Sequence, residues 1–235
     1  ALKGDNVAER SSSMDWYTGP TVLELLETIP VNSGRALELP FRFPIQYVLR
    51  EHASDYRAYA GKVTAGSISL NDVVSAPNGR ETRVVGIDSA DGEVEHAEAG
   101  DSVALRLADE IDLTRGDLLA AQPRPEDVTE FAATVVGLTE KDLAPGKPVK
   151  LRYGTSLVRA RLASVDRILD IDSADNDVID PAGVGLNDIA HVTIQVADEL
   201  PVEDYAARGA VGSFLLIDQA SGNTLAAGFV GTRLR

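Results

Sequence analysis

The sequence predicts an all-β protein made of two consecutive antiparallel β-barrels, preceded by a short helical lead-in. Two observations carry this prediction. Apolar and polar residues alternate with period two in many short runs, and turns rich in Gly, Pro, Asn and Asp separate these runs at short intervals. Only one run, within residues 20–29, has the spacing of an amphipathic helix. With 235 residues and 44% hydrophobic content, the chain is long enough for one large or two small domains with real cores.

The clearest strand pattern lies in residues 56–74. Tyr59, Gly61 and Val63 fall on one face of an extended segment, and polar or small residues fall on the other face. Gly66 interrupts the alternation before it resumes. Glycines at these two positions are expected where the chain bends or where another backbone approaches too closely for a Cβ atom. The stretch therefore predicts one wall of a small closed barrel.

The remaining strands divide the chain into two groups. We place the first barrel at residues 36–122 and the second barrel at residues 128–235. The polar, proline-containing segment 122–127 is the expected linker. Besides the stretch above, strands are predicted at 41–48, 82–87, 103–107 and 118–121, and then at 131–138, 149–153, 157–165, 189–196, 214–217 and 225–230.

Residues 1–35 form the lead-in. Pro20 suits the first position of a helix, where its missing N–H would have no partner in any case. The helix carries one apolar stripe, and Pro30 ends it. From the residues alone, the favoured interpretation is a helix that caps a barrel. The stripe consists of Val22, Leu25, Leu26 and Ile29.

Composition limits the classes of function. Lys and Arg number 22 and Asp and Glu number 37, for a net charge of −15, which weighs against a nucleic-acid partner. The absence of cysteine excludes a disulfide framework and is consistent with a cytoplasmic protein. No apolar run is long enough for a membrane span, so no membrane partner is expected. Because the chain starts at Ala1 rather than Met, we expect it to be a fragment of a longer protein.

Few side chains suggest chemistry by their spacing. The densest carboxylate cluster fails the calcium-loop pattern, because the fifth residue counted from Asp170 is Ala174 and the twelfth is Pro181. A solvated acidic loop is therefore favoured over a metal site. Arg159 and Arg161 could bind an anion, although the polar face of a strand is the default interpretation. The carboxylate cluster comprises Asp170, Asp172, Asp175, Asp177 and Asp180. The histidines His52, His96 and His191 do not have the spacing of metal ligands, and His191 is expected to face outward from its strand. Ser11, Ser12 and Ser13 do not lie in a nucleophile elbow.

The opening strands also resemble those of the second domain of translational GTPases, the superfamily of elongation factors Tu and 1-alpha, so the two barrels are expected to be like its domains II and III. In these proteins the nucleotide domain ends with a guanine-contacting loop and a short helix. Residues 1–7 are similar to the stretch that this loop leads into, and residues 16–24 are similar to the helix. The resemblance implies that Ala1 and Leu2 end the loop and contact the nucleotide. The sequence contains no G-x-x-x-x-G-K-[ST] motif and no Asn-Lys-x-Asp motif, so most of the nucleotide domain is missing. The matching barrel positions are Arg57, Gly61, Val63, Gly66, Ile68, Asp72 and Val74.

Within the superfamily, the chain is most similar to the large, GTP-binding subunit of bacterial sulfate adenylyltransferase. Four segments carry this resemblance: residues 41–48, 56–61, 110–117 and 212–218. It implies a protein that uses GTP and Mg in its full-length form and couples GTP hydrolysis to the formation of adenylyl sulfate from ATP and sulfate. The implied partner is a small catalytic subunit. The barrels would then serve as scaffold, subunit contact and lever, with no catalytic residue and no cofactor or metal site of their own, and the chain alone would be inactive.

Two alternatives remain open. One is a fragment of a translation elongation factor that binds aminoacyl-tRNA. The acidic net charge and the sequence Tyr59-Ala60-Gly61 argue against it. The other is a two-barrel interaction module with no GTPase relatives. The similarity of residues 16–24 to the helix of translational GTPases argues against this alternative.

Overall fold

The computed structural model describes residues 3–29, 36–51, 56–140, 143–171, 177–205 and 211–232. The chain divides into two compact units, residues 1–34 and residues 35–235. Both barrels belong to the second unit, so the finer division into domains at 36–122 and 128–235 stays a prediction.

In the first unit, the structure corrects the expected start of the helix. A 3₁₀ turn at Ser12–Met14 (η1) precedes the helix α1, Val22–Thr28. Thr21, not Pro20, caps it, because the Thr21 hydroxyl accepts from the amide of Glu24 while the Glu24 carboxylate accepts from the amide of Thr21. This reciprocal capping box fixes the start after Thr21, so Pro20 lies before the cap. No residue of α1 is buried.

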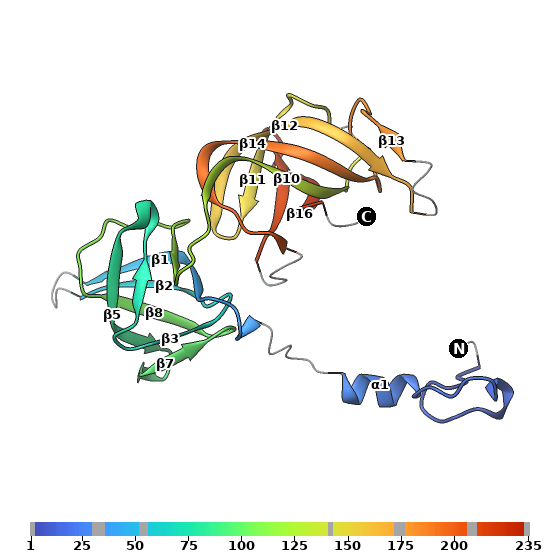
Figure 1. Cartoon of the computed structure of the whole chain (residues 1–235), viewed down its shortest axis with the longest axis horizontal. Helices are drawn as coiled ribbons and strands as arrows, with labels where there is room; N and C mark the ends of the chain where they lie inside the picture. Colours follow the sequence, from blue (N-terminus) through green and yellow to red (C-terminus); the bar gives the residue numbers. More distant parts are fainter. Residues whose placement is uncertain are drawn as a thin grey trace. The chain divides into compact units, whose positions relative to one another are not determined.

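The first barrel is a closed ring of six antiparallel strands (Figure 1). The ring runs in the order β4-β9-β1-β2-β8-β5 and closes where β5 pairs with β4, and β6 is added outside it. A separate ladder joins β3 to β7. The strands are β1 Arg42–Glu51, β2 Tyr56–Lys62, β3 Ser67–Ser69, β4 Val73–Ser75, β5 Glu81–Ser89, β6 Gly92–Val94, β7 His96–Glu98, β8 Ser102–Leu107 and β9 Leu118–Ala120, with a 3₁₀ turn η3 at Pro77–Gly79.

The alternation predicted for the stretch 56–74 is present. Tyr59 and Val63 are buried in the core of the first barrel. A Cβ atom on Gly61 would lie 2.6 Å from the carbonyl oxygen of Pro44, and one on Gly66 would lie 2.5 Å from the amide nitrogen of Phe41. Gly66 also has a φ of +68°. Both glycines therefore allow the close backbone approach that the sequence predicted.

The second barrel repeats the architecture with longer strands. Its ring runs β11-β15-β16-β10-β14-β12 and closes where β12 pairs with β11, and β13 is added outside it. Bulges in β12 after Leu162 and after Val165 shift the alternation of inward and outward side chains. The strand therefore continues to Leu169, beyond the end at residue 165 that the alternation predicted. The strands are β10 Asp127–Gly137, β11 Pro148–Tyr153, β12 Ser156–Leu169, β13 Val178–Ile179, β14 Ile189–Pro201, β15 Ser213–Asp218 and β16 Thr224–Val230.

Each barrel has its own apolar interior. In the first, Phe41, Phe43 and Leu105 are almost wholly buried, and in the second, Leu151 and Ile194 are fully buried. The described helices include none that is long and apolar enough to cross a bilayer.

Candidate functional site

The joint between the two barrels is built around a buried arginine. Arg42 lies on β1 between two core phenylalanines, and its side chain points away from the core of the first barrel. Glu203 follows β14 of the second barrel. Arg42 Nε lies 2.7 Å from Glu203 Oε2, and Arg42 Nη2 lies 2.9 Å from Glu203 Oε1. The side chains are 2% and 10% exposed, so this pair is shielded from water.

Every N–H of the Arg42 guanidinium has an acceptor. Besides the two bonds to Glu203, Nη1 donates to the carbonyl oxygens of Phe41 and Ala121, each at 2.9 Å, and Nη2 donates to that of Pro123 at 2.7 Å. A guanidinium has five such donors. A buried ion pair offsets its desolvation cost only when its remaining donors are also satisfied. One side chain therefore joins the first barrel, the linker and the second barrel.

Two further contacts support this joint. The amide of Glu203 donates to the hydroxyl of Tyr153, at 3.1 Å. Burial raises the pKa of Tyr153 to about 12, and the nearby Glu203 carboxylate adds to the rise. On the other side of the joint, the hydroxyl of Ser156 donates to the carbonyl oxygen of Gly116, at 2.8 Å. A small cavity of about 100 Å³ lies among Arg42, Tyr153, Ser156 and their neighbours. The contacts join the two barrels, and the Ser156 hydroxyl and the Glu203 carboxylate are engaged in them.

A recess of about 610 Å³ on the first barrel carries more polar groups. Tyr56 donates to Asp88 at 2.8 Å, and Arg106 Nε also donates to Asp88, at 3.1 Å. Burial, together with the hydrogen bond to Asp88, raises the pKa of Tyr56 to about 12. Arg57 and Tyr59 both donate to the carbonyl oxygen of Ile111. Protonated tyrosines and bonded arginines position the loop at residue 111 but supply no catalytic base.

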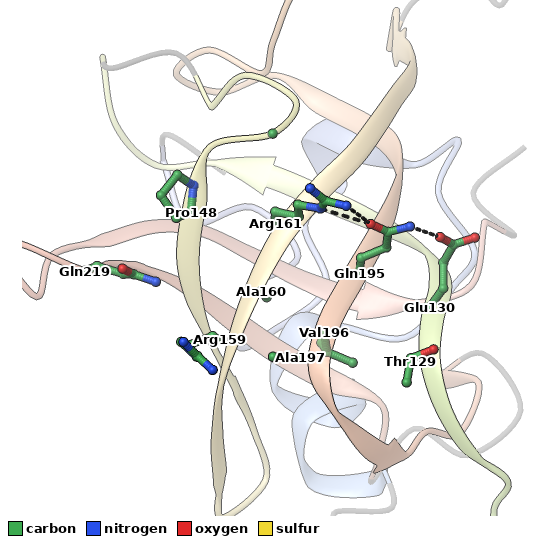
Figure 2. Close-up of a pocket in the computed structure, with 11 residues that line it drawn as sticks. Thr129, Glu130, Pro148, Arg159, Ala160, Arg161, Gln195, Val196, Ala197 and Gln219 are labelled. Carbon is green, nitrogen blue, oxygen red and sulfur yellow. Dashed lines mark hydrogen bonds between the residues drawn. The ribbon is translucent and has the colours of Figure 1, made fainter.

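A second recess, of about 640 Å³, lies on the outside of the second barrel (Figure 2). Glu130, Gln195 and Arg161 are in register on β10, β14 and β12, and their side chains form one chain of hydrogen bonds. Arg161 Nη2 donates to Gln195 Oε1 at 2.8 Å, and Gln195 Nε2 donates to Glu130 Oε2. Arg159 lines the same recess. The two arginines predicted on the polar face of this strand are thus exposed side by side.

The other candidate residues named from the sequence are not brought together in one site where the structure describes them. Ala1 and Leu2, expected to contact the nucleotide, lie outside the described residues, so that prediction stays open. His191 lies on the face of its strand opposite the core residues Ala190 and Val192, as predicted, but it is only 2% exposed, and Arg167 Nε donates to its Nδ1 at 3.1 Å. Its strand is covered on both faces at this point, which alternation alone does not reveal.

The acidic loop shows a structural role in its described part. Asp177 accepts a hydrogen bond from the amide of Asp170, at 2.8 Å, and lies 3.8 Å from Arg167. Within the described ranges, no group of three or more His, Cys, Asp or Glu residues could hold a metal ion. His52, Asp172 and Asp175 lie outside those ranges, while His96 is exposed and bonds to Ser69.

The sequence analysis missed the role of Arg42. A single arginine between Phe41 and Phe43 was a usable signal, because its two neighbours face the core of one barrel. That signal shows only that Arg42 faces away from this core. Its burial depends on Glu203, which the alternation pattern does not link to it.

Comparison with known proteins adds the family. Residues 130–231 match the model of the GTP-eEF1A C-terminal domain-like family. The chain is 39% identical to sulfate adenylyltransferase subunit 1 of Cronobacter sakazakii, over 98% of this chain and 48% of that protein. It is 38% identical to the bifunctional enzyme CysN/CysC of Mycobacterium tuberculosis strain H37Rv, over 98% of this chain and 38% of that protein. The chain thus spans half or less of the length of these relatives.

Solved structures agree with these sequence matches. The crystal structure of sup35 complexed with GMPPNP is similar with a TM-score of 0.75 and 25% identity, over 97% of this chain and 56% of that one. The structure of sup35 complexed with GDP has the same TM-score and 26% identity. The two barrels are therefore similar to those of a translational GTPase, and over nearly its whole length the chain is homologous to part of sulfate adenylyltransferase subunit 1.

Proposed function

We propose that this chain is the barrel region of the GTP-hydrolysing subunit of sulfate adenylyltransferase, which couples GTP hydrolysis to adenylyl transfer from ATP to sulfate. The supporting observation is 37–39% identity to relatives named subunit 1 of this enzyme, over nearly the whole chain. In this proposal the barrels act as scaffold, subunit contact and lever, and the chemistry takes place elsewhere. The proposed compartment is the cytoplasm, in keeping with a cysteine-free chain.

The buried pair of Arg42 and Glu203 supports the lever role. A ligand shifts a conformational equilibrium only through its differential affinity for two states. If a nucleotide-dependent domain reorients the barrels, then a joint that is rigid transmits the change from one barrel to the other. A bidentate, shielded ion pair with all five donors satisfied resists bending at the joint.

In this proposal, the nucleotide and its Mg ion are held mainly by residues other than those of the two barrels. The sequence lacks a phosphate-binding loop, and the described carboxylates form no cluster for a metal. GTP and Mg therefore belong, in this proposal, to the part of the longer protein that carries those motifs. Ala1 and Leu2 would lie at the edge of the guanine site.

The test is binding to the small subunit of sulfate adenylyltransferase. We expect this chain to bind the purified small subunit in calorimetry, weakly, and to the same extent with and without a GTP analogue. Nucleotide-dependent binding would contradict the lever interpretation. A complete absence of binding would place the subunit contact outside the barrels.

The alternative of a translation factor rests on the likeness to sup35. Identity is lower there than in the sulfate adenylyltransferase relatives, and the net charge of −15 opposes contact with tRNA phosphates. Binding of aminoacyl-tRNA at physiological salt would favour this alternative.

A further inference from the structure

The outer side of the second barrel carries a block of four cations, which we call the cationic face: Lys150 and Arg152 on β11, and Arg159 and Arg161 on β12. Lys150 is directly opposite Arg159 in the antiparallel register. The flanking residues Val149, Leu151 and Ala160 are buried, so the four cations alternate outward.

None of the four cations of this face forms a salt bridge with a described carboxylate. Among the described residues, the salt bridges involve Arg42, Arg57, Arg106, Arg124 and Arg167, and none involves a member of the cationic face. Within the part of the chain that the structure describes, the side-chain hydrogen bonds from these four residues are those of Arg161 to the neutral amide of Gln195. Two carboxylates lie nearby, but Glu130 bonds to Gln195 and Asp218 bonds to the turn at Ser221.

This arrangement is costly for the isolated protein. Like charges directly opposite on neighbouring strands destabilise a sheet. The chain has 37 acidic residues and 22 basic ones, so a carboxylate beside the Lys150–Arg159 pair would be the commonplace solution. A carboxylate supplied by another molecule would relieve the repulsion and bond to free guanidinium N–H groups.

Apolar side chains accompany the cations. Leu157 is opposite Arg152 on β12, and Leu215 is opposite Arg152 on β15. They are 46% and 36% exposed. At the other end of the ladder, the recess of about 640 Å³ opens beside Arg159 and Arg161, and its lining includes Pro148 and Ala197 (Figure 2). The surface thus combines positive charge with apolar contact area in one place.

We propose that the cationic face binds an acidic polypeptide segment of a partner protein, with carboxylates on Arg159, Arg161 and Lys150 and apolar side chains on Leu157 and Leu215. The charges form a compact block rather than a stripe, and apolar residues and two carboxylates border it, which fits a peptide better than a nucleic-acid backbone. The inference does not depend on the proposed enzyme, because any partner with such a segment would satisfy it.

The test uses this chain and a fluorescent peptide of repeating Glu-Glu-Leu. We expect saturable binding in fluorescence anisotropy, weakened by added salt. The double variant Arg159→Gln/Arg161→Gln should weaken it about tenfold, as expected for two lost charge-assisted contacts. The matched control is Arg80→Gln/Arg83→Gln, which removes the same charge from exposed positions of the first barrel and should leave binding nearly unchanged.

Several outcomes would overturn the proposal. One is that the peptide shows no saturable binding. Another is that both double variants weaken peptide binding equally. The third is that the chain binds tRNA tightly and the Arg159→Gln/Arg161→Gln change abolishes that binding. Circular dichroism of each variant checks its fold. If the double variant does not fold, the single variant Lys150→Gln must weaken peptide binding for the proposal to stand.

Discussion

Arg42 and Glu203 lie 161 positions apart in the chain, yet their side chains meet in a two-point ion pair that is almost inaccessible to water. The pair is the strongest polar contact described between the two barrels. It links two barrels that each have their own hydrophobic core, and we therefore expect them to move together.

Breaking this pair from one side should be costly. The Arg42→Met variant removes the guanidinium that balances the charge of the buried Glu203 carboxylate, so we expect the free energy of unfolding to fall by about 3–5 kcal/mol. Urea unfolding measures this loss. The double variant Arg42→Met/Glu203→Met should recover part of it, because no buried charge remains. An unchanged midpoint for Arg42→Met would show that the pair is not formed in solution; Arg80→Met, at an exposed arginine, is the control.

Gly66 should tolerate no side chain. In the Gly66→Ala variant the new methyl would meet the carbonyl oxygen of Leu39 and the amide of Phe41, both at 2.5 Å. The matched control is Gly79→Ala, because Gly79 has a nearly equal φ of +71° and no atom within 4 Å of its Cβ position. We expect the control to cost about 1 kcal/mol for its backbone conformation and Gly66→Ala to cost several times more. Equal unfolding temperatures for the two variants would contradict the close approach.

The protein should lose stability at high pH through Tyr153. Its pKa is raised from 10.0 to about 12 in the folded state, so the protonated phenol is favoured by folding. This contribution, about 3 kcal/mol, is fully present below pH 10 and is lost as the pH rises towards 12. Urea unfolding across this range should give a shallower loss for Tyr153→Phe than for the unchanged protein. Tyr47→Phe, at an exposed phenol, should leave the slope as it is; if it flattens the slope as much, Tyr153 is not the cause.

The chain should not bind guanine nucleotides by itself. It has neither a phosphate-binding loop nor an Asn-Lys-x-Asp motif, so the β- and γ-phosphates and the base would lack their usual donors. A titration of fluorescent GDP should show no saturable signal, with sup35, which has been crystallised with GDP, as the positive control. Micromolar affinity for this chain would refute the prediction.

Much of the fold could be predicted from local sequence. Period-two alternation located most strands, because a strand with one face in a barrel core must place every second side chain inward. The stretch around Tyr59 and the strands predicted at 214–217 and 225–230 are confirmed in this way. The short strands β6 and β7 were not predicted, because three residues are too few to show a period. The end of β12 was also missed, because bulges change the phase of the alternation within this strand.

The sequence alone determined the class of each barrel, the glycines at its close approaches, the absence of nucleotide motifs and the resemblance to a family that the comparisons then confirmed. These features depend on neighbours in the chain, where spacing and residue type are sufficient evidence. Only the tertiary structure decided that Arg42 is buried against Glu203, that His191 is covered, and that Lys150 and Arg159 stand opposite each other with no salt bridge to a described carboxylate. Burial and charge pairing depend on which distant segments meet, and the free energy of a charged group changes greatly with the water and the counter-charge around it.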